Sequence, residues 1–181
     1  MNIGFDLDKV FINFPPFIPP KFIRIMYGEK SNGQLTYRIP GKIEQKIRQL
    51  SHIPFLRQPM RENMQIVKTM STRHNWNFFL ISSRYGFLRH ATETLVQKYG
   101  LTKYFKKLYF NFSNQQPHLF KSLAITKEHI DAYIDDDLPL LIYLAKQHPH
   151  VHFFWLNEKT MGKIQKNIEA ITNFSDFFKK L

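Results

Sequence analysis

The sequence predicts an α/β protein in which helices cover both faces of a parallel sheet. Two observations lead to this fold class. Short apolar runs with the length of strands alternate with segments whose apolar residues recur at helical spacing. The chain of 181 residues, 43% hydrophobic and 22% charged, is also long enough for one such domain with a sizeable core and a modest insertion.

The first strand is expected in residues 1–5, an apolar run that leads directly into Asp6-Leu7-Asp8. Such a run suits a buried parallel strand whose carboxyl end opens into a site. Residues 10–14 are again mostly apolar and predict a small flap. A boundary follows, because prolines break regular structure. These prolines are Pro15, Pro16, Pro19 and Pro20.

Residues 15–72 are interpreted as a small, mostly helical insertion, and residues 1–14 and 73–181 as the core domain. Glycines keep the first half of the insertion loop-like, and they are Gly28, Gly33 and Gly41. Two helices are expected in its second half, because apolar residues fall on one face at helical spacing. These residues are Ile43, Ile47 and Leu50 in the first helix, and Met60, Met64, Val67 and Met70 in the second. The methionines are interpreted as packing residues.

The alternation of strands and helices resumes at residues 76–81, a strand that runs into Ser82-Ser83-Arg84. A helix in residues 88–99 can end at Gly100. The elements expected after it are a strand in residues 108–112, a helix in 119–125, a strand in 132–134, a helix in 140–144 and a strand in 151–155.

Local signals supplement this pattern. Asp137 is expected to cap the helix that follows it, and Ser175 a short C-terminal helix. Three phenylalanines near the first strand either wall a site or pack the insertion, and packing is favoured. They are Phe11, Phe14 and Phe17.

The composition restricts the chemistry. The absence of cysteine excludes disulfides, thiolate zinc sites and cysteine nucleophiles. Any metal must use oxygen or imidazole ligands, which favours hard cations such as Mg²⁺. The net charge of +12 favours anionic partners, including nucleic acid. A cytoplasmic protein is expected, because charges interrupt the first apolar run and no apolar stretch reaches the roughly 18 residues of a membrane span.

Polar residues stand at or just after the expected strand ends. They are Asp6 and Asp8, Ser82, Lys121, and Asp135 and Asp136. Singly, each has an ordinary interpretation as a chance acidic pair, a turn residue or a solvated lysine. In one parallel sheet, however, the strand ends converge. Carboxylates brought together there repel one another unless cations compensate. A divalent ion and the Lys121 ammonium would do so, which indicates a site for a dianionic phosphoryl group.

The order of these residues resembles the four motifs of the haloacid dehalogenase (HAD) superfamily, and the resemblance covers the chain apart from the insertion. The matching segments are Ile3-Gly4-Phe5-Asp6-Leu7-Asp8-Lys9-Val10, Leu80-Ile81-Ser82, Lys121 and Tyr133-Ile134-Asp135-Asp136. The insertion lies where that superfamily places its class 1 caps. The paired Asp135-Asp136 and the small cap are similar to the 5′(3′)-deoxyribonucleotidase group. The resemblance implies a HAD-like, Rossmannoid fold.

The resemblance also implies a Mg²⁺-dependent phosphomonoester hydrolase with a small phosphorylated substrate, such as a nucleotide. Asp6 would attack phosphorus and form an aspartyl-phosphate. Asp8 would protonate the leaving alcohol and then deprotonate the attacking water. Lys121 would hold Asp6 and neutralise charge on the transferring group.

The remaining implied roles concern the phosphate and the metal. Ser82 would donate a hydrogen bond to a phosphoryl oxygen, and Ser83 and Arg84 are further candidates for phosphate binding. Arg84 is equally compatible with a surface position. The implied metal site comprises Asp6, the backbone carbonyl of Asp8, Asp135 and Asp136.

One residue departs from the superfamily pattern, because Lys9 stands where glycine usually follows the second aspartate. Lysine there is compatible with an altered flap, an added phosphate contact or weakened activity. Two alternative functions stay open: a catalytically weakened HAD-fold binding protein, suggested by Lys9, and a phosphatase acting on nucleic-acid ends, suggested by the net charge of +12. A phospho-receiver domain is disfavoured, because its acidic pair comes first and its acceptor aspartate ends a middle strand.

Overall fold

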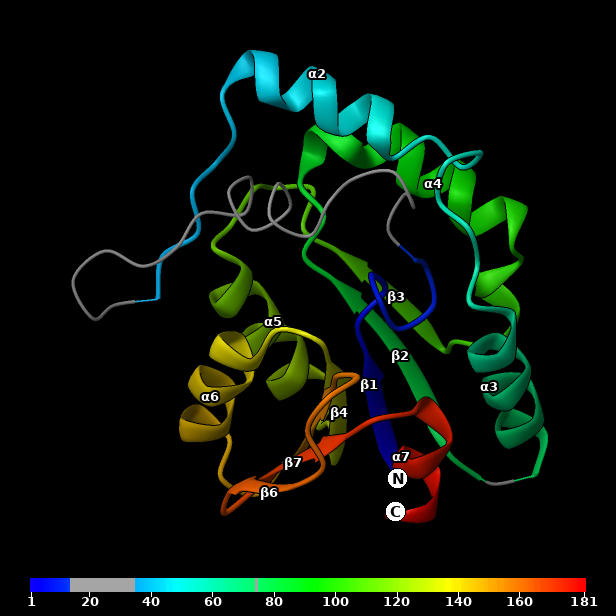
Figure 1. Ribbon diagram of the computed structural model, residues 1–181, viewed down its shortest axis with the longest axis vertical. Coiled ribbons are helices and arrows are strands. Elements are labelled where there is room, and N and C mark those ends of the chain that lie inside the picture. Colours follow the sequence, from blue (N-terminus) through cyan, green and yellow to red (C-terminus); the bar gives the residue numbers. More distant parts are fainter. Residues whose placement is uncertain (14–34, 74) are drawn as a thin grey trace.

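The computed structural model describes residues 1–13, 35–73 and 75–181, and these form one seven-stranded sheet with helices on both faces (Figure 1). The strands are β1 (Asn2–Phe5), β2 (Asn77–Ser82), β3 (Lys107–Phe110), β4 (Ala132–Asp135), β5 (His152–Leu156), β6 (Gly162–Gln165) and β7 (Ile168–Ile171). Their order is β3-β2-β1-β4-β5-β7-β6, and every neighbouring pair is parallel except β6 with β7. The predicted α/β class with a largely parallel sheet is confirmed.

The helices form a layer on each face of the sheet (Figure 1). One face carries α3 (Arg61–Arg73), α4 (Arg89–Lys98) and α7 (Phe174–Lys179). The other carries α5 (Pro117–Lys127) and α6 (Leu138–Gln147). The helix α2 (Lys42–Ser51) lies at the top of Figure 1, beyond the carboxyl ends of the strands. Single 3₁₀ turns precede and follow α4, namely η1 (Gly86–Leu88) and η2 (Leu101–Lys103).

Side chains that alternate along the strands build one apolar cluster under each helical layer. Phe78 and Leu80 of β2 belong to the cluster with α3, α4 and α7, whereas Phe79 and Ile81 belong to the cluster with α5 and α6. Burial on both faces explains why the central strands appear in the sequence as continuous apolar runs.

The chain changes direction across the sheet at β1. β2 and β3 extend the sheet on one side of β1, and β4 and β5 then extend it on the other. In open α/β sheets, ligands bind beyond the carboxyl ends of the strands at such a switch point. The fold therefore directs attention to the residues that follow β1 and end β4.

The described part of the predicted insertion contains the two helices expected there. Met64, Val67 and Met70 of α3 pack against the apolar cluster on the α3 face of the sheet, which confirms the packing interpretation for these methionines. In contrast, the apolar face of α2 is exposed: Ile43 is 79% and Leu50 is 64% accessible. The division of the chain into a core and an insertion stays a prediction.

Several predictions fall on residues 14–34, which lie outside the described residues. They concern the prolines, Gly28, Gly33, Phe14 and Phe17. Phe11, by contrast, is 1% exposed and contacts the rings of Phe5 and Phe105, so it is a packing residue, but of the core rather than of the insertion.

Some local predictions need correction. The strands β6, at the sheet edge, and β7, beside it, were not predicted, because apolar and polar residues mix in both. The predicted strand in residues 108–112 ends at Phe110. Asn173, rather than Ser175, caps α7, because its side chain accepts a hydrogen bond from the Asp176 backbone N–H. The Ser175 hydroxyl donates to Asn173 instead.

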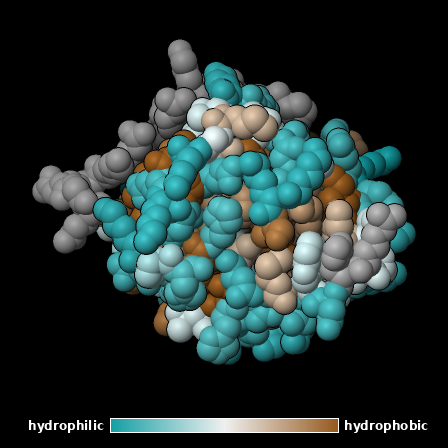
Figure 2. Space-filling model, turned by 90° about the horizontal axis from the view of Figure 1, so that it is seen from below, coloured by the Kyte–Doolittle hydropathy of each residue, from teal (hydrophilic) through white to brown (hydrophobic). Residues whose placement is uncertain are grey.

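The face of the molecule opposite α2 is mostly hydrophilic (Figure 2). Figure 2 shows the molecule from the end opposite α2, where polar residues cover most of the face and apolar ones are scattered among them. Among the described residues, no helix is both long and apolar enough to cross a membrane.

Candidate active site

Three of the predicted residues lie at the carboxyl ends of neighbouring strands, around the switch point of the sheet. Asp6 directly follows β1, Ser82 ends β2, and Asp135 ends β4. Because β1 pairs with both β2 and β4, these three positions are neighbours across the sheet. The Asp6 backbone N–H donates to the Ile134 carbonyl at 3.0 Å. This bond continues the backbone hydrogen bonds between β1 and β4 as far as Asp6.

Lys121 lies between two of the carboxylates. Its Nζ atom is 2.7 Å from Asp6 Oδ1 and 2.6 Å from Asp135 Oδ2, and all three side chains are buried. The helix α5 positions the lysine on its inward face, one turn after Pro117 at the helix start. Burial alone would lower the pKa of Lys121, but the Asp135 and Asp6 carboxylates raise it well above its usual value. Lys121 is therefore a fixed, permanently charged cation.

Asp6 is held in one orientation. Its Oδ1 atom accepts from Lys121, and its Oδ2 atom accepts from the Asp8 backbone N–H at 2.9 Å. Burial raises the pKa of Asp6 well above its usual value, and Asp135 adds to this shift while Lys121 opposes it. Burial and the neighbouring Asp135 carboxylate thus both disfavour the charged form of Asp6, and Lys121 favours it.

Asp6, Asp135 and Asp136 form the group that fits a metal ion. One carboxylate oxygen of each lies within 4.8 Å of the others. Three oxygen donors of this kind suit a hard divalent cation such as Mg²⁺. The Lys9 Nζ atom lies 2.6 Å from Asp136 Oδ2. Burial and the nearby Asp135 raise the pKa of Asp136 to about 6, although Lys9 opposes this shift.

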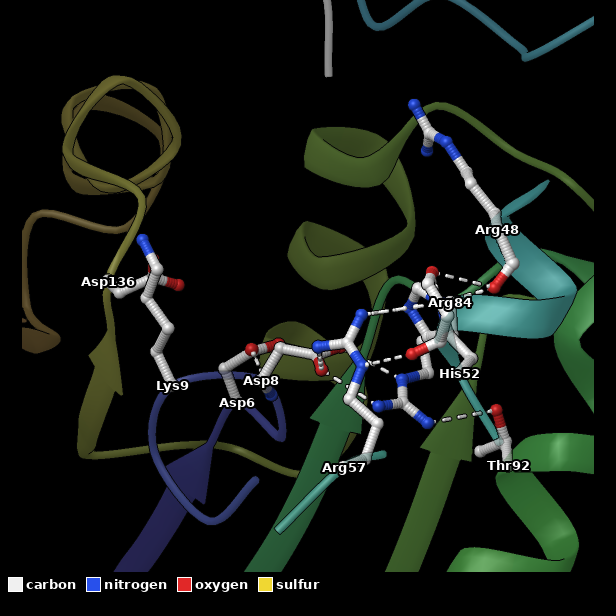
Figure 3. Close-up of polar contacts among 10 residues, drawn as sticks. Asp6, Asp8, Lys9, Arg48, His52, Arg57, Arg84, Thr92 and Asp136 are labelled. Carbon is white, nitrogen blue, oxygen red and sulfur yellow. Dashed lines mark hydrogen bonds and ion pairs between the residues drawn. The ribbon is translucent and has the colours of Figure 1, made fainter. Parts of the chain in front are cut away.

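The Asp8 carboxylate is turned away from this acidic group and toward two arginines (Figure 3). Arg84 donates to both of its oxygens, from Nε at 2.9 Å and from Nη2 at 2.8 Å. Arg57 Nη1 lies 3.4 Å from Asp8 Oδ1. Burial would raise the pKa of Asp8, but Arg84, and then Arg57, hold it well below its usual value. In this geometry Asp8 is a carboxylate.

Neighbouring residues hold the two guanidinium groups in place. Arg57 Nη2 lies 2.7 Å from His52 Nε2, and Arg57 Nε donates to the Ser51 carbonyl at 3.1 Å. Arg84 Nη1 lies 3.4 Å from Thr92 Oγ1 on α4. Burial, together with the charges of Arg84 and Arg57, lowers the pKa of His52, so this histidine is neutral.

Some of these residues could not be found by sequence reasoning. Arg57 and His52 belong to no motif, and only the folded chain brings Arg57 to Asp8 across 49 positions. Arg84 is 5% exposed, so the interpretation of this residue as a surface arginine is wrong. Ser83 carries a buried Oγ atom for which the described residues provide no hydrogen-bond partner.

The segment before α2 is attached to the core beside the site. The Tyr37 hydroxyl donates to Asp137 Oδ2 at 2.7 Å, and the Tyr37 backbone N–H donates to Gln116 Oε1 at 2.9 Å. Asp137 Oδ1 also accepts from the Leu140 backbone N–H at 3.1 Å, which confirms Asp137 as the predicted cap of α6. The predicted insertion therefore reaches the α5 and α6 starts as well as Asp8.

No family model matches the chain, and no curated protein does. Among solved structures, a haloacid dehalogenase-like family hydrolase from Streptococcus pneumoniae is similar, with 9% identity and a TM-score of 0.65 over 99% of this chain and 97% of that one. A haloacid dehalogenase-like family hydrolase from Xanthomonas campestris has 11% identity and a TM-score of 0.58 over 99% and 93%.

A chain from a structure of the Pnkp1/Rnl/Hen1 RNA repair complex is also similar, with 12% identity and a TM-score of 0.52. The match covers 86% of the present chain but only 42% of that one. At such identities the similarity concerns the fold. With the strand order and the Asp6, Lys121 and Asp135 positions, it shows that the chain has the haloacid dehalogenase-like hydrolase fold.

Proposed function

We propose that this chain is a Mg²⁺-dependent phosphomonoester hydrolase that works through an aspartyl-phosphate on Asp6. The observation that carries the proposal is the buried arrangement of Asp6, Lys121 and Asp135 at the switch point of the sheet. The oxygens of Asp136 complete a set that fits a divalent ion. A nucleophile, a fixed cation and a metal site within one group are the parts that phosphoryl transfer requires.

In the first step, an Asp6 oxygen attacks phosphorus while the bond from phosphorus to the ester oxygen breaks. Lys121 keeps Asp6 oriented and places its positive charge beside the transferring group. When bound, the metal ion supplies Lewis-acid stabilisation of the phosphoryl oxygens. Water then attacks the aspartyl-phosphate, which releases inorganic phosphate and regenerates the Asp6 carboxylate.

Asp8 and Arg84 are assigned linked roles. Protonation of the leaving oxygen by Asp8 requires its carboxylate to take up a proton, which the paired guanidinium groups oppose. We propose that Arg84 exchanges Asp8 for a phosphoryl oxygen when substrate binds, because its guanidinium can pair with either anion. Asp8 then becomes available as acid and base, and Ser82 and Ser83 are assigned to the phosphoryl group.

Residues 15–72 are proposed as the cap that determines the substrate. The position of α2 beyond the strand ends supports this proposal, as do the contacts of Arg57 and Tyr37 with Asp8 and Asp137. A small cap of this kind suits a nucleotide or a similar phosphorylated metabolite, as in the deoxyribonucleotidase group that the sequence resembles.

A phosphatase acting on nucleic-acid ends is the second candidate. The net charge of +12 and the similarity to a chain of an RNA repair complex favour it. The two candidates differ in their response to salt, because contacts with a nucleic-acid backbone weaken steeply as salt rises. Rates on a 3′-phosphorylated oligonucleotide and on nucleoside monophosphates, each at low and high salt, separate them.

The test of the main proposal is phosphate release from p-nitrophenyl phosphate, with Mg²⁺ and with chelator. We expect activity that requires Mg²⁺ and that falls at least about a thousandfold in Asp6→Asn, which loses the nucleophile. Asp131→Asn is the matched control. The Asp131 carboxylate accepts a hydrogen bond from the Asn2 backbone N–H, at the end of β1 that is remote from Asp6. Equal activity in Asp6→Asn and wild type would exclude Asp6 as the nucleophile.

A further inference from the structure

Lys9 occupies a backbone position that is unusual for lysine. Its φ angle is 58°, in the left-handed region that glycine adopts most easily. The turn around it is well defined, because its N–H donates to the Ile12 carbonyl at 2.8 Å and the Phe11 N–H donates to the Leu7 carbonyl at 3.0 Å. The tight turn thus fixes the origin of the Lys9 side chain close to the acidic group.

The Lys9 side chain extends from this turn to Asp136 at the end of β4 (Figure 3). Its ammonium lies 2.6 Å from an Asp136 oxygen, and Asp136 is one of the three carboxylates within metal-binding distance of one another. The Lys9 ammonium is therefore a positive charge next to Asp136, the most exposed of the three carboxylates.

The two ammonium groups at the site differ in their freedom to move. The Lys121 side chain is 3% exposed and is paired with two buried carboxylates. The Lys9 side chain is 46% exposed, and its Asp136 partner is 20% exposed. The long Lys9 stem lets its ammonium reach solvent, whereas the Lys121 ammonium is enclosed by protein. Of the two lysines, Lys9 is thus the one that a metal ion can displace.

We infer that the Lys9 ammonium competes with a divalent metal ion for Asp136, so that Lys9 lowers the affinity of the site for Mg²⁺. The inference deepens the proposed function and rests on its metal site. An ammonium and a divalent cation a few ångströms apart repel each other, so the metal binds well only after Lys9 has left Asp136. Lys9 thereby sets the free Mg²⁺ concentration at which the site fills.

The test measures metal binding directly, with Mn²⁺ as the probe and the signal of free Mn²⁺ in electron paramagnetic resonance as the readout. Lys9→Gln removes the charge, and Lys9→Gly also relieves the left-handed backbone. We expect both variants to lower the dissociation constant for Mn²⁺ by about tenfold or more. Asp136→Asn should raise that constant strongly.

The chain offers a matched control for the change in charge. The Lys107 side chain is 51% exposed and pairs with the Glu128 carboxylate at 2.9 Å, at the start of β3 and thus at the opposite end of the sheet. Lys107→Gln changes the net charge as Lys9→Gln does. We expect it to leave the Mn²⁺ dissociation constant within about twofold of wild type.

The outcomes separate this inference from the proposed function. Equal or weaker Mn²⁺ binding in Lys9→Gln than in wild type would overturn the inference, as would equal tightening in Lys107→Gln. No Mn²⁺ binding in any variant would overturn both the inference and the metal site. Tighter binding in the Lys9 variants of a protein without phosphatase activity would support the inference while the proposed function fails.

Discussion

At the scale of single residues, the site combines groups that sequence order identifies with groups that it does not. Asp6 and Asp135 were found because polar residues at the ends of apolar strands converge in a parallel sheet, and Lys121, on α5, was found from the order of the motifs. The pairing of Asp8 with Arg57 was not predicted. Neither periodicity nor a motif connects a loop arginine to a carboxylate 49 positions earlier in the chain. This pairing makes Asp8 a structural charge as well as a catalytic candidate.

Asp8→Asn is expected to destabilise the fold at neutral pH by about 3–5 kcal/mol, because it leaves two buried guanidinium groups without their carboxylate. The folded pKa of Asp8 lies below its ordinary value of 3.8, so the stabilisation is complete above that value and is lost as pH falls through the lowered pKa. Urea denaturation should therefore show a large difference from wild type at pH 7 that shrinks only below about pH 4. A difference from wild type that stays equally large as pH falls well below 4 would contradict the assignment.

At the scale of elements, a strand could be predicted from the sequence where it is buried on both faces of the sheet. The central strands are buried on both faces and appear as apolar runs, whereas β6 and β7 form a mixed edge hairpin without a clear period. The spacing of Ile43, Ile47 and Leu50 predicted a helix, and α2 forms there. Periodicity does not say what an apolar face packs against, and in the described residues this face stays exposed.

Close packing between β1 and β4 yields a prediction for Gly4. A Cβ atom added to Gly4 would lie 2.5 Å from Tyr133 Cδ2, closer than packed atoms allow. We expect Gly4→Ala to lower the free energy of unfolding by about 1–3 kcal/mol, measured by urea denaturation. Gly41→Ala is the control, because a Cβ at Gly41 meets no atom of the described residues within 4 Å and its φ of −68° suits alanine. Equal stability of the two variants would refute the packing argument.

At the scale of the whole molecule, the strand order brings the site together. Residues from the first strand and from positions 121 to 136 meet only because β4 returns to pair with β1. The alternation of elements was sufficient to predict this class of sheet, since parallel strands need crossover helices on both faces. The contacts of the predicted insertion beside the site could not be predicted in the same way, because contacts such as Tyr37 with Asp137 depend on loop conformation.

Because the acidic group joins the ends of β1 and β4, metal binding should stabilise the entire fold. An ion that binds only the folded chain adds about 2.7 kcal/mol of stability at a concentration 100 times its dissociation constant. For a chain of 181 residues this corresponds to a rise in Tm of about 5–10 °C. Calorimetric scans with increasing Mg²⁺, at constant ionic strength, should show this rise in wild type and lose it in Asp136→Asn, which removes one of the three carboxylates of the proposed metal site. An identical rise in Asp136→Asn would place the bound ion elsewhere on the molecule.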